Sequence, residues 1–319
     1  MKNTVFFLIL AAGLAGCNRS PEYYFKRANY LVSVGKDSQA LENYNKALLL
    51  QRNFPEALTA RGMFYERQGD RQKAGLDYAR SIEIKSSYLP AYNNMAAMFM
   101  DEGNYKEAVR VLSQALDTNP DYAYALLNRG LSHYKLSNCG AASQDLTRAV
   151  DLNPRFELAF YHRALCARKA NNITAALADL DSVLALNPAA AMAWFERGKL
   201  KYHMGDYTGA SQDFDKAAGL KPEDQPFVYW RALALYKTGK FESALEGALA
   251  AFGLKADSYQ AAGLAGDIYA AMGDIPKTRE YYLKAAQISP KYSAYYKSRL
   301  AAAVKAAARR YASLGPATK

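Results

Sequence analysis

Histidines and cysteines are the residues of this chain whose side chains most often serve catalysis or bind metals. His133, His162 and His203 are the three histidines, and no carboxylate or cysteine cluster joins them at the spacing of metal ligands. The sequence contains no glycine-rich phosphate loop, no Gly-x-Ser-x-Gly turn and no His-Glu-x-x-His helix. The sequence therefore predicts no catalytic residue, no metal, no cofactor and no enzyme activity.

Cys17 ends a segment that resembles a bacterial lipoprotein signal. Residues 1–16 start with a lysine, continue with the apolar run Val5–Ala12 and end in small residues, as a secretory signal peptide does. The four residues Leu14-Ala15-Gly16-Cys17 resemble a lipobox, which implies that Cys17 is acylated and becomes the mature N-terminus. Residues 17–20 would then be a lipid anchor and a short tether. The alternative is an ordinary signal peptide with a chance cysteine.

The residue after the anchor bears on localisation. An Asp at that place is the usual inner-membrane retention signal of Gram-negative lipoproteins, and this chain has Asn18. The resemblance therefore implies a lipid-anchored protein of the bacterial cell envelope, in the outer membrane and facing the periplasm.

The charge of the chain is unevenly distributed. The formal net charge is +11, but seven cations and no acidic residue lie beyond Pro290, so the rest of the chain carries only +4. A protein that binds nucleic acid should spread its basic residues along the working surface. We therefore expect no nucleic-acid partner.

The chain from Pro21 to Tyr292 repeats itself. It divides into eight rows with a period of 34 residues and no insertion. Position twenty is Ala in seven rows and position fifteen is Gly in six, with Ser137 and Asn171 in the other two. A small residue suits a close helix crossing, and Gly suits the left-handed residue that ends a helix. Rows start at Pro21, Pro55, Leu89, Ala123, Glu157, Ala191, Gln225 and Tyr259.

This pattern resembles the tetratricopeptide (TPR) repeat family. The resemblance implies an all-α, right-handed superhelix in which each row is a helix A, a turn and a helix B. Residues 21–292 would form eight repeats, residues 293–313 a basic capping helix, and residues 314–319 a C-terminal tail.

Position seven of the rows carries a column of arginines that could be mistaken for a phosphate-binding ladder. Position twenty-three supplies an Asp in four of the same rows. We therefore expect Arg–Asp pairs inside a repeat, which would fix the register of the two helices. The pairs are Arg61–Asp77, Arg129–Asp145, Arg163–Asp179 and Arg197–Asp213.

Cys139 and Cys166 lie in consecutive rows, early in one helix B and late in the next helix A. In TPR stacking those segments adjoin, and the expected compartment is oxidising, so a disulfide is one reading. Two small buried hydrophobic residues are the other reading. The sequence leaves the two readings open.

The concave face of a TPR array is built from helix A, and here rows four to seven place aromatic and cationic residues on it. Aromatic rings and Arg or Lys are typical of interaction hot spots. We therefore predict that this groove binds partner peptides or helices. The predicted contact residues are Tyr124, Leu127, Asn128, Tyr134, Lys135, Tyr161, His162, Arg168, Lys169, Phe195, Lys199, Tyr202, His203, Tyr229, Trp230, Tyr236 and Lys237.

These features together predict a non-enzymatic scaffold or assembly adaptor for envelope proteins, held at the membrane by its lipid. The carboxylate clamp with which some TPR proteins hold chaperone tails is missing its matching Lys and Arg, so that partner is not expected. Tyr-rich surfaces also stack on sugars, so the alternative is a scaffold that binds or exports polysaccharide or peptidoglycan.

Overall fold

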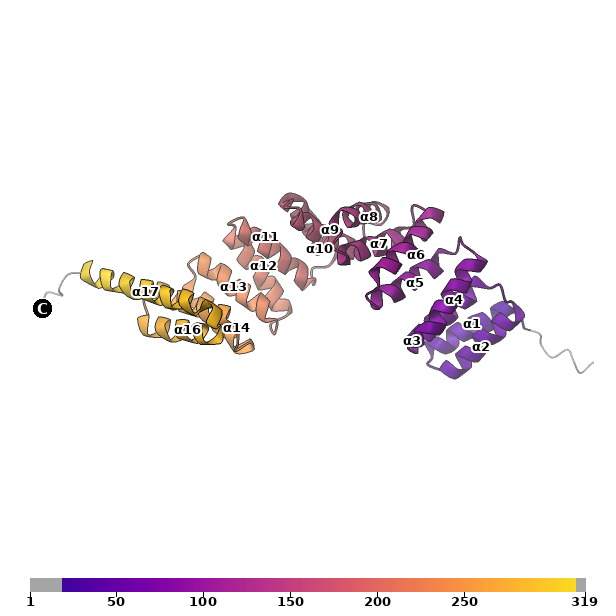
Figure 1. Ribbon diagram of the computed structural model, residues 1–319, viewed down its shortest axis with the longest axis horizontal. Helices are drawn as coiled ribbons and strands as arrows, with labels where there is room; N and C mark the ends of the chain where they lie inside the picture. The colour runs from indigo at the N-terminus through magenta and orange to yellow at the C-terminus, as the bar shows by residue number, and fades with distance from the viewer. Residues whose placement is uncertain (1–18, 314–319) are drawn as a thin grey trace, which may run out of the picture. The chain divides into compact units, whose positions relative to one another are not determined.

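The computed structural model describes residues 19–313, so the predicted signal peptide, Cys17 and the tail 314–319 lie outside the described residues. Within the described range the chain forms 17 α-helices and one short 3-10 helix, and no β-strand (Figure 1). The prediction of an all-α fold of repeated helix pairs is confirmed. Its right-handed superhelical sense stays a prediction.

The helices form two compact units, unit 1 ending at His162 and unit 2 beginning at Arg163. The boundary falls inside α9 (Glu157–Lys169). In unit 1, consecutive helices pack as antiparallel pairs: α1 (Pro21–Ser33), α2 (Asp37–Leu50), α3 (Pro55–Arg67), α4 (Arg71–Ile84), α5 (Leu89–Asp101), α6 (Tyr105–Thr118), α7 (Ala123–Lys135) and α8 (Cys139–Leu152).

Unit 2 repeats the arrangement and ends in a longer helix. The pairs in this unit are followed by a 3-10 turn (Pro290–Tyr292) and by α17, which packs on α16 (Figure 1). The helices are α10 (Ile173–Leu186), α11 (Ala191–His203), α12 (Tyr207–Leu220), α13 (Gln225–Lys237), α14 (Phe241–Leu254), α15 (Tyr259–Met272), α16 (Ile275–Ile288) and α17 (Ser293–Ser313).

Each helix A starts at the first residue of its row and is followed by a left-handed turn residue at position fifteen. Gly occupies that turn in six rows, and Ser137 (φ 61°) and Asn171 (φ 58°) take the same conformation in the other two. The fifteenth column of the sequence thus predicted the turn, because this backbone conformation favours Gly and tolerates Asn.

Small residues on helix A make room for bulky residues on helix B. A Cβ placed on Gly62 would lie 2.6 Å from the ring of Tyr78, and one on Gly266 would lie 2.7 Å from the ring of Tyr282. Both tyrosines are buried. In α17, Tyr296 and Leu300 are also buried, at 7% and 9% exposure, so this helix covers the end of the core. Among residues 19–313, no helix combines the length and hydropathy that a membrane span requires.

Candidate functional site

The arginine column holds each repeat together. Arg61, Arg129, Arg163 and Arg197 each donate two hydrogen bonds to the Asp of their own helix B, over 2.7–2.9 Å. Asp213, the carboxylate paired with Arg197, is 2% exposed. The two hydrogen bonds that Arg129 donates to Asp145 raise the pKa of Arg129. The predicted intra-repeat pairs are therefore present, and these arginines are structural.

The same arginines also reach the preceding repeat, which the column pattern did not predict. Arg61 donates to Asn45 of α2 at 2.7 Å, and Arg197 donates to Asp181 of α10 at 2.6 Å. In repeat six, Lys201 also contacts the inner carboxylate, because its ammonium lies 2.9 Å from Asp213. One buried Asp thus receives two cations from the facing helix A.

In unit 1, the predicted groove residues form an aromatic group on α7 and α9. The His162 ring lies 4.7 Å from the Tyr134 ring and 5.4 Å from the Tyr161 ring, both edge to face. Tyr124 is 54% exposed and meets Phe156 at 5.3 Å. These contacts leave ring surface at the helix A face. Lys135, at the end of α7, is exposed.

His162 is held in its neutral form. Burial, followed by the charge of Lys135, lowers its pKa to about 4. Within the described part of the chain, its buried Nδ1 has no hydrogen-bond partner. No group of three His, Cys, Asp or Glu side chains in residues 19–313 could hold a metal ion. The ring thus contributes shape and aromatic surface to the group.

In unit 2, α11 and α13 carry a second aromatic group. The Trp230 ring is met edge to face by Tyr202 at 5.3 Å, His203 at 6.0 Å and Tyr229 at 6.4 Å. Tyr202, Tyr229 and Trp230 are half-buried and His203 is exposed. The rings hold one another in place while one side of the group remains open, so a ligand could be met without large loss of side-chain entropy.

For two of the predicted contact residues, the expectation of an exposed side chain is wrong. Leu127 and Phe195 are 9% and 8% exposed, so both belong to the core. Both occupy position five of helix A, which faces the next repeat. Phe195 of α11 packs on Phe227 of α13 at 4.7 Å. Asn128 is also engaged inside the array, because its amide donates to Asn93 at 2.8 Å.

Part of the predicted positive charge is neutralised by an acid that the prediction omitted. Glu196, which is 7% exposed, lies 3.5 Å from Arg168 and 3.1 Å from Lys199. Glu196 occupies position six, one of the concave columns, so the sequence contained the signal. Three other predicted cations are exposed at the C-terminal ends of α7, α9 and α13, namely Lys135, Lys169 and Lys237.

Sequence models of the tetratricopeptide repeat match the rows that build these surfaces. One matches residues 25–90, 127–181 and 229–293, and two others match residues 96–137 and 163–228. The chain belongs to the tetratricopeptide repeat family. A search of curated proteins finds no sequence similar to it.

Solved structures show the same TPR fold. YrrB has a TM-score of 0.52 and 21% identity, with 58% of this chain and 95% of YrrB covered. A TPR protein from Parabacteroides merdae has a TM-score of 0.54 and 20% identity, covering 78% and 98%. Pseudomonas aeruginosa pilF has a TM-score of 0.59 and 17% identity, covering 67% and 97%. At these identities the likeness shows the fold alone.

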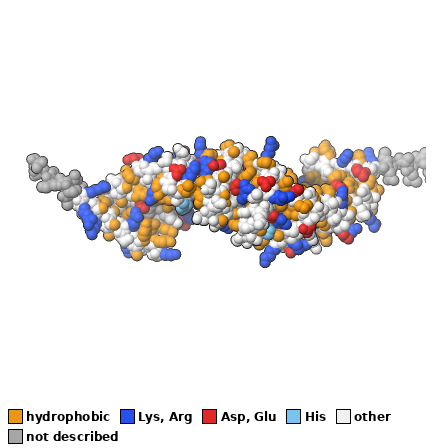
Figure 2. Space-filling view, turned by 90° about the horizontal axis from the view of Figure 1, so that it is seen from above, with side chains coloured by type: hydrophobic (Ala, Val, Ile, Leu, Met, Phe, Trp, Pro, Cys, Tyr) orange, Lys and Arg blue, Asp and Glu red, His pale blue; other side chains and the backbone are white. Residues whose placement is uncertain are grey.

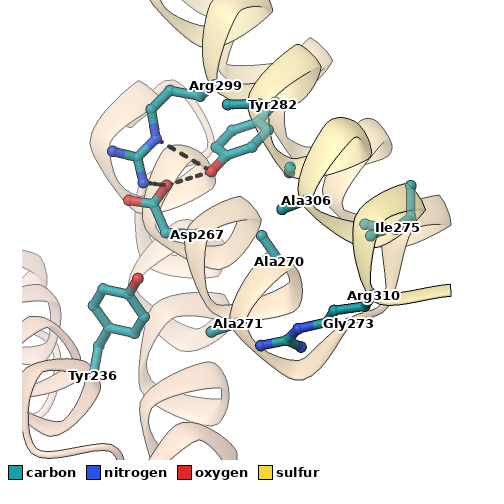
Figure 3. Close-up of a pocket in the computed structure, with 13 residues that line it drawn as sticks. Tyr236, Asp267, Ala270, Ala271, Gly273, Ile275, Tyr282, Arg299, Ala306 and Arg310 are labelled. Atoms are coloured by element: carbon teal, nitrogen blue, oxygen red, sulfur yellow. Dashed lines mark hydrogen bonds and ion pairs between the residues drawn. The ribbon is translucent and has the colours of Figure 1, made fainter. Parts of the chain in front are cut away.

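The last TPR helix pair carries a polar cluster that the prediction also omitted. Arg299 of α17 lies 2.5 Å from Asp267 of α15, and the Tyr282 hydroxyl donates to the same carboxylate oxygen at 2.5 Å (Figure 3). Burial raises the pKa of Asp267 even though both partners oppose the shift. Arg299 stands at position seven of a ninth row, so the arginine column itself could have revealed it.

The two remaining cysteines belong to different units. Cys139 in α8 is half-buried, and Cys166 in α9 is buried. Both readings of the pair, a disulfide or two small buried hydrophobic residues, stay predictions.

Proposed function

We propose that this TPR protein is a non-enzymatic protein-interaction scaffold that binds partner peptides or helices on its helix A faces. The observation that carries the proposal is the half-open aromatic group of Tyr202, His203, Tyr229 and Trp230, with the exposed Lys237 on the same helix as Trp230. Rigid aromatic rings beside a cation are the composition of protein-binding hot spots. The preferred ligand would carry apolar and acidic side chains.

The family supports this proposal in general terms. YrrB is described as a TPR protein with an unusual peptide-binding site, so the shared fold can present such a site. In the proposed scaffold of this chain, the aromatic groups of the two units each supply contacts.

We further propose that the scaffold is lipid-anchored in the bacterial envelope through Cys17 and faces the periplasm. The support is the lipobox-like segment before Cys17 and the apolar run that precedes it. Its partners would be other envelope proteins. A Cys17→Ser variant should leave a precursor or move the protein to the soluble periplasmic fraction. Unchanged partitioning into the detergent phase would rule the anchor out.

Partner capture from detergent-solubilised membranes tests the binding role. The double variant Tyr202→Ala/His203→Ala should lose crosslinked partners identified by mass spectrometry, while its helical circular-dichroism signal is kept. The matched control is Leu220→Ala/Leu254→Ala, on exposed helix B residues of the same unit. Partner loss in the control alone would place binding on the helix B face and contradict the proposal.

The polysaccharide alternative rests on the same tyrosines and is separated by a different measurement. Sedimentation with purified peptidoglycan or exopolysaccharide should leave the protein in the supernatant. Cosedimentation that depends on Tyr202, without any captured protein, would favour the alternative.

A further inference from the structure

One side of α1 in unit 1 carries tyrosines and basic residues, and we call this side the outer face of α1. It consists of Tyr23, Lys26, Arg27 and Tyr30, which follow one another at the spacing that places side chains on the same side of a helix. Tyr30 is 64% exposed, and Lys26 and Arg27 are exposed as well. The N-terminal end of unit 1 shows Lys or Arg and hydrophobic side chains next to one another (Figure 2). The outer face thus combines aromatic surface with positive charge.

The other repeats place different residues at the same positions of helix A. Position three, which is Tyr23 in repeat one, is Ala in six of the other seven repeats and Phe227 in the remaining one, and all seven side chains are buried. Position ten, which is Tyr30 in repeat one, is also buried in the seven other repeats. The outer face is therefore built from side chains that differ from those of a helix side that packs inside the array.

Arg27 is the position-seven arginine of repeat one, and it is not paired as the arginines of the other repeats are. Position twenty-three, which supplies an Asp in four other repeats, is Asn43 here. Arg27 donates instead to the hydroxyl of Tyr23 at 3.2 Å. The guanidinium of Arg19 lies over the same ring, with its Cζ 4.3 Å from the ring centre. Tyr23 therefore holds two cations at the outer face.

Positive charge exceeds negative charge at this helix. Within the part of the chain that the structure describes, Arg19, Lys26 and Arg27 form no ion pair with a carboxylate. Glu22 is the single acid of α1. Tyrosine, lysine and arginine are the side chains typical of contact with lipid headgroups, because their apolar parts enter the interface while their polar ends stay hydrated. Anionic headgroups are complementary to the excess of cations.

The proposed lipid anchor would bring the outer face close to a membrane. Ser20, the N-cap of α1, follows Cys17 by three residues. At about 3.3–3.6 Å per residue, this length of chain spans at most about 11 Å. A helix of 13 residues is about 20 Å long, so α1 would start near the headgroups and could lie along them.

We infer that the outer face of α1 lies on the membrane surface and binds anionic lipid headgroups. Arg19, Lys26 and Arg27 would meet the headgroup charges, and the two tyrosine rings would lie at the level of the headgroups. The inference rests on the proposed lipid anchor, to which it adds a class of lipid and an orientation of repeat one. Salt screens contacts between cations and anionic lipid, so the contact should weaken as ionic strength rises.

The test uses the full acylated chain, reconstituted in vesicles of equal parts phosphatidylcholine and phosphatidylglycerol. A nitroxide on the phosphatidylcholine headgroup quenches tryptophans that lie close to it. Tyr30→Trp should therefore add a quenched component to the emission of the two native tryptophans, which both lie in unit 2. The matched control is Leu76→Trp on α4, at a side chain that is 65% exposed, which should add an unquenched component.

Charge reversal separates headgroup binding from closeness to the anchor. Arg27→Glu, combined with Tyr30→Trp, should lower the ratio of quenched to unquenched emission from position 30 by at least about tenfold. Vesicles of phosphatidylcholine alone should lower it as well. Lys106→Glu changes the net charge by the same amount at an exposed residue of α6, and it should alter the ratio by no more than about twofold.

The outcomes distinguish this inference from the anchor. If the chain floats with the vesicles but Tyr30→Trp is quenched no more than Leu76→Trp, the inference is wrong and the anchor stands. If the wild-type chain does not float with the vesicles, both are wrong. Equal quenching at position 30 with and without phosphatidylglycerol would also overturn the inference. Protein adducts from a photoreactive analogue at position 30 in cells, without quenching in vesicles, would assign the outer face to a polypeptide instead.

Discussion

Repeat six and the C-terminal end of unit 2 use the same residue column in two ways. In repeat six, Arg197 and Lys201 enclose a carboxylate that is 2% exposed. At the end of the array, Arg299 has no helix B of its own in the described residues, and it pairs instead with Asp267 on the preceding helix A. The arginine at position seven thus joins the two helices of its own repeat in repeat six, and joins two neighbouring helices A at the C-terminal end of unit 2.

The largest effect should come from the interior carboxylate. Asp213→Ala leaves two cations facing a buried site without their acid, so it should lower the free energy of unfolding by about 3–5 kcal/mol. Urea denaturation followed by circular dichroism would measure it. The control is Asp181→Ala, which removes the exposed acid that also contacts Arg197 and should cost roughly 0–1 kcal/mol. Equal losses in both variants would contradict the structural role given to Asp213.

The corresponding loss at the end of the array should be smaller. Asp267 and Arg299 have side chains that are 23% and 39% exposed, so water can solvate the arginine once its partner is gone. Asp267→Ala should therefore lower the free energy of unfolding by roughly 1–2 kcal/mol. The same urea titration compares the two sites directly. A loss as large as that of Asp213→Ala would show that the end of the array is built like its interior.

Repeat six and the C-terminal end of unit 2 differ in how far the sequence could predict them. The period, the turn residues and the Arg–Asp columns follow from local spacing, so the helix pairs and their internal ion pairs were predictable. Phe195 was assigned to the surface because its column borders the groove. Its burial depends on Phe227 in the next repeat, which a single row does not reveal.

Asp267 and Arg299 were missed for a related reason. The rule that pairs position seven with position twenty-three needs a helix B in the same row, and α17 has none in residues 19–313. Glu196 could have been identified from the sequence, because it stands in one of the concave columns. Its contacts with Arg168 and Lys199 follow once the helices are stacked as TPR repeats.

The smallest predicted effect is a pH dependence at the end of the array. Burial raises the pKa of Asp267 above its usual value of 3.8, so the folded chain binds a proton more readily than the unfolded chain. Its contribution to stability should therefore fall as pH rises from 3.8 through the raised pKa. The free energy of unfolding of the wild type minus that of Asp267→Asn should decrease as pH rises above about 4. A constant difference would mean that Asp267 is not desolvated.

Site-specific photocrosslinking in cells tests the central claim, that the helix A faces bind a polypeptide partner, most directly. A photoreactive phenylalanine analogue would replace Tyr202 on helix A or Leu220 on the adjacent helix B, and irradiated membranes would be examined for adducts. The account predicts discrete protein adducts from position 202 and none from position 220. Adducts from position 220 alone would contradict it.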